Sequence, residues 1–385
     1  MKSNKMNSLQ RLFAFLMIAV LLVCTVAFVA GGLQSTPDND INSGDVGDET
    51  EKTDDNTDNT DNTLNDTNQD LEDNESNNPP NTQPDEPSVN TPKFYNTMTG
   101  LETSEGALST TPLGFVVDPK MPIYGISSAD ITFEFPLEKG KTRLLSYITN
   151  SSMLWKVGSI TQTRAFISST ANLIGGIVVS YGNDDIVKYS AWDASKANLD
   201  ISKISGCYYV ENTLYIYTSK DMVDTAQNAS ASVVGSTYKS APYLFSDTDV
   251  TGTTKASSVI LPYSDADKTS LYYSNESQKY LYFKSDARKV DMLNGKNISF
   301  TNVFILFANS TTYDNSVGTE LVVDNTSGGS GYYISKGYLT EIKWSVSDSG
   351  ALEFRTLGGE ILSVNRGNAY IGYYKASCAS EINIG

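Results

Sequence analysis

The stretch SSADITFEFPLEKGKTRLLSYIT, residues 127–149, decides how the folded part of this chain is organised. Two runs of alternating residues flank Lys139 and Gly140, a pattern typical of a β-hairpin. Residues of one parity share a face of a strand, which gives an apolar set, Ile131, Phe133, Phe135 and Leu137, and a polar set, Thr132, Glu134, Pro136 and Glu138. The pattern predicts one buried face and one polar face that carries two carboxylates.

The length of the turn decides where Arg143 lies. A two-residue loop puts Arg143 opposite Pro136, on the face of both glutamates, whereas a three-residue loop puts it opposite Leu137, on the other face. Only the first register builds a charged cluster. Glu134 and Glu138 should stand roughly 13 Å apart at ~3.3 Å per residue, too far for an inverting carboxylate pair.

A second arginine, Arg164, is the single formal charge in VGSITQTRAF, residues 157–166. It precedes a predicted helix, and a charge among apolar neighbours requires a partner. We expect Glu134 or Glu138 to be that partner, with Arg164 fixing the helix against the sheet; substrate binding is the alternative. The candidate binding residues are therefore Glu134, Glu138, Arg143 and Arg164, and no catalytic residue is assigned.

Composition excludes several chemistries. The chain has no histidine, so Ser-His-Asp, Cys-His and histidine-metal mechanisms are not available within it. Its three cysteines lack metal-type spacing, and we expect neither a metal nor a cofactor. Cys207 and Cys378 are interpreted either as a disulfide of an oxidising exterior or as two free thiols.

The N-terminus contains an uncharged apolar run, residues 12–30, after Lys2, Lys5 and Arg11. As a helix it would be roughly 28 Å long, near the thickness of a bilayer core. An uncleaved anchor is preferred, lipidation at Cys24 is second because Val23 replaces the usual small residue, and cleavage near Ala30 or Gly32 is the third possibility. Each predicts an extracytoplasmic protein; the anchor holds it at the cell membrane.

The next segment, residues 33–92, is rich in Asp, Asn and Thr and nearly free of aliphatic residues. Such a composition predicts a disordered, self-repelling spacer. Residues 1–90 hold 4 basic and 17 acidic residues, a net charge of −13, which leaves only −4 of the total of −17 for the rest. Because no basic cluster is present, nucleic acid is excluded as a partner.

From Phe94 onward the sequence predicts an α+β, strand-rich fold. Helices are expected over 162–174 and 219–230, with Thr218 or Ser219 as the cap of the second. A linker over 246–258 divides the prediction into a signal or membrane anchor (1–32), a disordered linker (33–92), an N-terminal α+β domain (93–250) and a β-rich C-terminal domain (251–385). Trp155 and Trp344 are expected to pack in the core or on a sheet, with carbohydrate stacking as the alternative.

Several segments carry a family resemblance. NTMTGLETS (96–104), the hairpin above and KVGSITQTRAF (156–166), followed by TNVFILFANSTTY (301–313) and the run from Gly329 to Tyr374, resemble in order and spacing the YerB-like family of bacterial surface lipoproteins. The resemblance implies a two-domain surface protein of unassigned activity.

Matched residue by residue, the family pattern falls on Asp130, Glu134, Glu138, Gly140, Thr142, Arg143, Gly158, Arg164, Asp291, Asn302, Gly331, Gly337, Trp344, Gly359, Asn365 and Gly367. This chain departs from it where Thr161 replaces an arginine and where Ser180 or Tyr181 replaces a histidine. A Pro-His-Asn segment of the family is replaced by Thr213, Leu214 and Tyr215. The resemblance therefore implies that much of any polar family site is absent here.

These observations predict a membrane-tethered, non-enzymatic binding or scaffolding module of the cell envelope. Its expected partners are the membrane, through the N-terminal segment, and a cell-wall polymer or an envelope protein. The alternative is a carboxylate-dependent hydrolase of wall glycan or peptide, in which Glu134 or Glu138 acts while Arg143 and Arg164 position an anionic group.

Overall fold

The hairpin of residues 127–149 lies in the middle of a large sheet in the computed structural model of the chain. The structure describes residues 93–105, 111–152, 154–182, 197–230, 232–233, 235, 241–314 and 319–385. The predicted anchor, Cys24 and the linker 33–92 lie outside the described residues. Among those described, no helix is long and apolar enough to cross a membrane.

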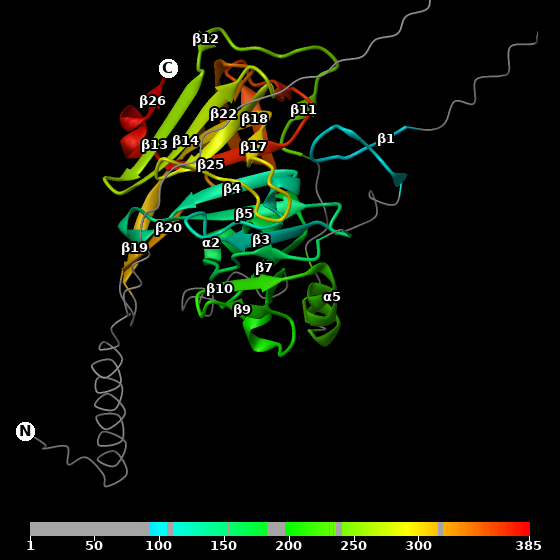
Figure 1. Cartoon of the computed structure of the whole chain (residues 1–385). Helices are drawn as coiled ribbons and strands as arrows, with labels where there is room; N and C mark the ends of the chain where they lie inside the picture. The colour runs from blue at the N-terminus through cyan, green and yellow to red at the C-terminus, as the bar shows by residue number, and fades with distance from the viewer. Residues whose placement is uncertain are drawn as a thin grey trace, which may run out of the picture. The chain divides into compact units, whose positions relative to one another are not determined.

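The central sheet has 11 strands within the described residues, and β4 and β5 stand at its middle (Figure 1). Its order is β12-β22-β21-β18-β25-β4-β5-β3-β7-β8, with β23 paired to β22. Its strands are β3 (Leu113–Val117), β4 (Ile131–Pro136), β5 (Thr142–Ile148), β7 (Ile177–Ser180), β8 (Asn198–Asp200), β12 (Thr254–Lys255), β18 (Asn302–Ala308), β21 (Gly329–Ser335), β22 (Tyr338–Val346), β23 (Leu352–Thr356) and β25 (Ala369–Lys375).

Smaller sheets surround it. Within the described part of the chain, a second sheet has six strands, β13 (Ser258–Ser264), β14 (Asp267–Ser274), β15 (Lys279–Lys284), β16 (Ala287–Arg288), β17 (Ser299–Phe300) and β26 (Asn383–Ile384). The others are β6-β10-β9 (Val157–Gly158, Tyr215–Thr218, Tyr209–Glu211), β1-β2 (Phe94–Tyr95, Glu102–Thr103), β11-β24 (Leu244–Phe245, Ser363–Val364) and β19-β20 (Ser310–Asp314, Thr319–Val323).

Helices are short and few in the described ranges. The predicted helix over 162–174 is split into α2 (Ala165–Ser168) and α3 (Thr170–Ile174), and the second prediction is confirmed as α5 (Lys220–Ala229), capped by Ser219. Four 3₁₀ turns complete the set, η2 (Ile126–Ser128), η3 (Glu138–Gly140), η5 (Ile201–Lys203) and η6 (Ala376–Glu381). The strand-rich prediction is confirmed.

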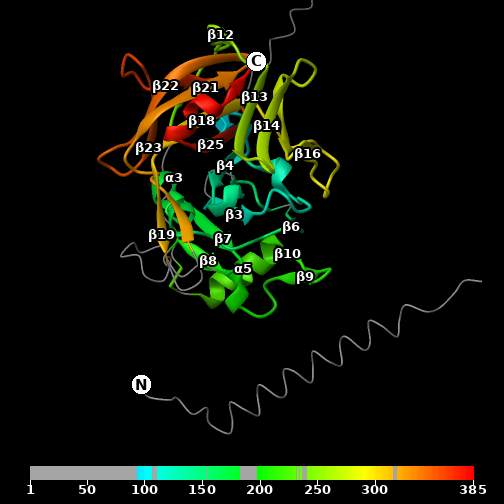
Figure 2. The ribbon, with the colours of Figure 1, turned by 90° about the vertical axis from the view of Figure 1, so that its left-hand side faces the viewer.

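Both faces of the central sheet are buried, which corrects the expected polar face of the hairpin. All six residues of β4 are buried. One face packs on β13, β14 and β15 and on α5, and the other on α2 and α3. Figure 2 shows β13 and β14 standing beside β25 and β4. Since the strands of the second sheet that cover Glu134 come from residues 267–284, this coverage is not visible in the local pattern.

The register of the hairpin decides between the two expected loops. Phe135 pairs with Arg143, and Pro136 with Thr142, so Arg143 lies on the face opposite to Glu134. The face matches the three-residue alternative, but the pairing is shifted by two residues because η3 begins at Glu138. The register that places Arg143 beside both glutamates is therefore wrong.

The predicted boundary at residue 250 lies within one compact unit, Asp85–Gly385. The central sheet draws strands from both sides of that boundary, joined where β25 pairs in parallel with β4. Parallel pairing of strands so far apart in sequence requires long connections, which here carry the second sheet. The division into two sequence domains stays a prediction.

Two other expectations are decided by burial. Trp344 is buried and donates from Nε1 to Phe307 O, as a core residue should. Trp155 is 69 % exposed, so the expectation that it packs in the core is wrong. Cys207 and Cys378 are free thiols, and of the two alternatives the disulfide is not formed.

Gly140 supplies a test of how tightly η3 packs on the second sheet. It has φ +68°, and a Cβ there would lie 2.4 Å from Ser264 Cβ and 2.7 Å from the carbonyl oxygen of Tyr263. Gly295 has φ +73° with nothing within 4 Å, which makes it a matched control. Both alanine variants should lose about 1 kcal/mol of unfolding free energy from backbone strain. Gly140→Ala should lose about 1–3 kcal/mol more because its Cβ overpacks the site. Urea unfolding of the full-length variants measures both; equal losses would contradict the close approach.

Candidate functional site

The four sequence-predicted residues occupy two separate places. Glu134 points from β4 toward the second sheet and is 0 % exposed. Glu138, Arg143 and Arg164 gather around the β4–β5 turn, where the charges of Glu138 and Arg164 both act on Arg143. The structure therefore brings three of the four together and separates Glu134 from them.

Glu134 is surrounded by donors. Its carboxylate accepts hydrogen bonds from five side chains, Thr142 Oγ1 (2.6 Å), Thr269 Oγ1 (2.8 and 3.0 Å to the two oxygens), Tyr282 OH (3.1 Å), Tyr370 OH (2.8 Å) and Lys284 Nζ (2.9 Å). These donors come from β5, β14, β15 and β25, so the carboxylate lies where the two sheets meet. Five donors from two sheets thus converge on one carboxylate.

The two phenols are held in their donating form. Burial raises the pKa values of Tyr282 and Tyr370 well above the ordinary value of tyrosine, and the charge of Glu134 adds to the rise. Both hydroxyls therefore keep their protons at any ordinary pH. They serve as fixed donors to the carboxylate and not as acids or bases.

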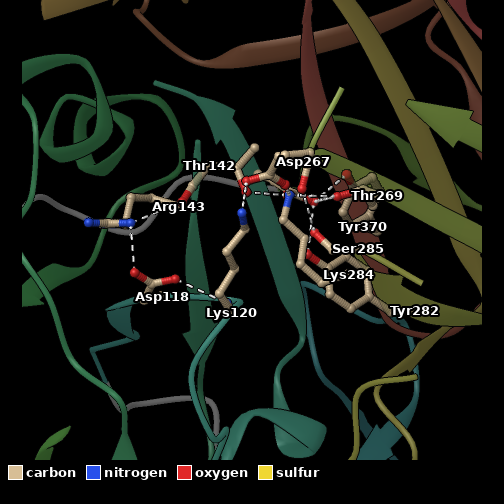
Figure 3. A network of polar contacts seen from close by, with 12 residues as sticks. Asp118, Lys120, Thr142, Arg143, Asp267, Thr269, Tyr282, Lys284, Ser285 and Tyr370 are labelled. Atoms are coloured by element: carbon tan, nitrogen blue, oxygen red, sulfur yellow. Dashed lines mark hydrogen bonds and ion pairs between the residues drawn. The ribbon is translucent and has the colours of Figure 1, made fainter. Parts of the chain in front are cut away.

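Lys284 continues the network toward the surface (Figure 3). Its ammonium is 1 % exposed and lies between Glu134 and Asp267, 2.7 Å from Asp267 Oδ1. Asp267 is 3 % exposed, and its Oδ2 lies 2.8 Å from Nζ of Lys120, whose side chain is 43 % exposed. Opposite charges thus alternate from the interior to solvent.

Asp118 connects this network to Arg143. Its carboxylate accepts from the backbone N–H of Lys120 (3.0 Å) and from Arg143 Nη1 (3.0 Å). Burial lowers the pKa of Arg143, and the charge of Arg164 acts in the same direction while Asp118 and Glu138 oppose it. The guanidinium remains charged at neutral pH because its ordinary pKa is so high.

Arg164 forms the ion pair expected of it. Nη2 donates to Glu138 Oε1 at 3.0 Å, and the residue stands at the N-cap of α2. Although burial acts to raise the pKa of Glu138, backbone hydrogen bonds and the Arg164 charge hold it below its ordinary value. A carboxyl with a lowered pKa is a poor general acid at neutral pH. Of the two expected partners, Glu138 is the one that pairs with Arg164, and Glu134 is not.

A cleft of about 420 Å³ lies next to this ion pair, between α2 and the β19–β20 ribbon; we call it the β20 cleft. Phe166, Val322 and Val323 give it apolar walls, and hydroxyl and amide side chains and the carboxylate of Asp324 are also part of its lining. Asn325 Nδ2 donates to Phe166 O and Ser169 Oγ, both at 2.8 Å, and so fixes the ribbon against the helix.

A second, polar cleft of about 290 Å³ is lined by both signs of charge. Arg366 pairs with Asp247 at 2.7 Å, and Lys336 pairs with Asp249. Both aspartates are largely exposed, and paired rim charges of this kind neutralise one another. Among the described residues no group of three or more His, Cys, Asp or Glu side chains is placed to hold a metal ion.

Sequence reasoning missed most of the buried network. The predicted site residues do not include Lys284, Asp267, Thr269, Tyr282 or Tyr370. One signal was available, because Tyr280, Tyr282 and Lys284 share a face of the strand KYLYFK, and a lysine in line with two aromatic core residues needs a buried partner. The partner itself lies 150 residues away, beyond any local pattern.

Comparisons with known proteins identify relatives of most of the described region. Residues 98–232 match the family "Protein of unknown function (DUF3048) N-terminal domain", and residues 259–371 match its C-terminal domain. The fold is similar to the crystal structure of YerB protein from Bacillus subtilis, with 21% identity and a TM-score of 0.64 over 76% of this chain and 100% of that chain. No curated protein matches the sequence.

The buried network predicts a large effect for Glu134. Glu134→Ala removes one partner of a buried ion pair and leaves Lys284 and four hydroxyls without their acceptor. It should therefore cost about 3–5 kcal/mol of unfolding free energy. Glu102→Ala is the control, since Glu102 pairs with Lys93 at 60% and 64% exposure and should cost at most about 1 kcal/mol. Equal midpoints in urea for the two variants would contradict the assignment.

The Arg164–Glu138 pair predicts a pH dependence. Arg164→Ala should cost between about 1 and 3 kcal/mol at pH 7, since the pair is neither exposed nor fully buried, and Arg164→Lys should restore part of it. Because the folded pKa of Glu138 lies below 4.5, the ion pair's contribution to the free energy of unfolding is present above that pH. It is lost as pH falls through the folded pKa.

Urea unfolding of wild type and both variants between pH 7 and about pH 3 measures the difference in unfolding free energy between wild type and each variant. It should shrink toward the acidic end as Glu138 is protonated. An unchanged midpoint for Arg164→Ala at pH 7 would mean that Arg164 does not anchor the helix and would favour a ligand-binding role.

Proposed function

The chain belongs to the DUF3048 family of unknown function, and from that premise we propose that it is a membrane-tethered, non-enzymatic binding module of the cell envelope. The single observation that carries the proposal is the state of the carboxylates. Glu134 is inaccessible and fully hydrogen-bonded, and the pKa of Glu138 is lowered by its partners. A carboxylate hydrolase needs an accessible acid with a raised pKa.

The tether is part of the proposal. It rests on the apolar run 12–30 after three basic residues and on the acidic spacer that follows it. With such a spacer the folded unit is held away from the bilayer surface, within reach of polymers and proteins of the envelope.

We place the binding surface at the β20 cleft. Its apolar side chains, interspersed with hydroxyl and amide groups, suit a ligand that alternates methyl groups with amides and hydroxyls. Wall peptides and acetylated wall glycans have this chemistry. The cleft is therefore assigned to a wall polymer, and an envelope protein is the competing partner.

Sedimentation with purified cell wall tests the proposal. The full-length protein in detergent should pellet with insoluble wall and should release no reducing ends or free amino groups from it. Val322→Asp places an unpaired charge in the cleft and should weaken wall binding about tenfold. Leu357→Asp, at a residue 55% exposed and outside the cleft lining, is the matched control and should bind like wild type.

The outcomes separate the alternatives. Soluble products in the supernatant would support the hydrolase and overturn the non-enzymatic proposal. No pelleting of wild type would remove wall polymer as the ligand. Equal binding by Val322→Asp and wild type would mean that the wall is bound elsewhere than at the β20 cleft.

A further inference from the structure

The contact between Lys284 and Asp267 differs from the contact between Lys284 and Glu134. Nζ lies 2.7 Å from Asp267 Oδ1, yet neither oxygen of this buried carboxylate accepts a hydrogen bond. By contrast, the same Nζ donates a hydrogen bond to Glu134 at 2.9 Å. The nitrogen is therefore in close contact with the Asp267 carboxylate, outside the alignment of a hydrogen bond.

From this geometry we propose that Lys284 and Asp267 condense to an intramolecular amide, an isopeptide bond between Lys284 Nζ and Asp267 Cγ. Strand register holds the two groups together, because Lys284 pairs with Thr269 and Asp267 lies two residues before Thr269 on the same face. Two groups fixed in contact inside a rigid sheet react as if at very high concentration.

The buried surroundings favour an uncharged product. The ring of Tyr263 lies 4.9 Å from Nζ, and Tyr282 and Tyr370 are fully buried on the same side. Burial among aromatic side chains penalises charged groups, so replacing the ion pair by a neutral amide is more favourable here than in water. The product amide carries no charge and removes two buried ions.

Glu134 and Lys120 stand where the reaction needs them. Glu134 contacts Nζ and is placed to take its proton, which makes the amine a nucleophile. Lys120 Nζ lies 2.8 Å from Asp267 Oδ2, where it stabilises the negative charge that grows as Nζ attacks Cγ.

The step balances in atoms and charge. The bond from Nζ to Cγ forms, and one bond from Cγ to a carboxylate oxygen breaks. Nζ loses two protons, Glu134 carries them, and both end on the departing oxygen, which leaves as water. Glu134 returns to its starting state, and no oxidant, reductant or further reactant takes part.

A tryptic map of the full-length wild-type protein, digested after denaturation, tests the bond. Trypsin does not cleave after an acylated lysine, so peptides 256–268 and 280–288 should appear as one linked species lacking one water. The same hairpin supplies an internal control, since Lys268 and Asp286 pair at 2.9 Å while both are exposed and should not link. Recovery of free 256–268 together with cleavage after Lys284 would overturn the proposal.

Two variants test the roles of Lys284 and Glu134 in the reaction. Lys284→Arg cannot form the bond and should release free 256–268 together with the separate peptides 280–284 and 285–288. Glu134→Gln should lower the linked fraction at least tenfold in freshly purified protein, and an unchanged fraction would remove Glu134 from the reaction. The wild-type map decides whether the bond exists even where a variant fails to fold.

Discussion

A single buried carboxylate connects the layers of this protein. Glu134 lies where the central sheet meets the second sheet, and its donors come from four strands, β5, the β14–β15 hairpin and β25, in three separate parts of the sequence. A charge in such a place is tolerated only when every lone pair has a donor at the right distance. The packing of β14 and β15 on β4 and β25 therefore has to satisfy this group, and a slip of one residue in any of the four strands would remove a donor.

The local sequence pattern was sufficient to predict the secondary-structure elements and one ion pair. The strands, α5 with its Ser219 cap, and a glutamate of the hairpin as the partner of Arg164 all follow from alternation, capping and the need of a charge for a nearby partner. The choice of Glu138 over Glu134 came from the structure, because the second sheet covers Glu134. The hairpin register was not predictable, because η3 begins one residue earlier than the turn residues Lys139 and Gly140 suggest.

The buried network was beyond local prediction for a physical reason. Alternation cannot distinguish a polar residue facing solvent from one facing a second sheet, since both occupy the same side of the strand. Glu134 was assigned to a polar face, and only the coverage by residues from 267 to 284 makes it an interior group. Trp155 shows the reverse error, since its size suggested burial although no element of the described chain covers most of its surface.

Cys207 and Cys378 show that this protein is not stabilised by a disulfide between them. Proteins outside the cytoplasm commonly gain stability from disulfides, but Cys207 is buried and Cys378 partly buried, and both are free. Burial raises the pKa of Cys207, which keeps it protonated and unreactive. For an extracytoplasmic location, the covalent cross-link in reach is therefore an amide. It would join the two strands that supply Lys284 and Thr269 to Glu134, so that the hairpin would stay closed even where the layers separate.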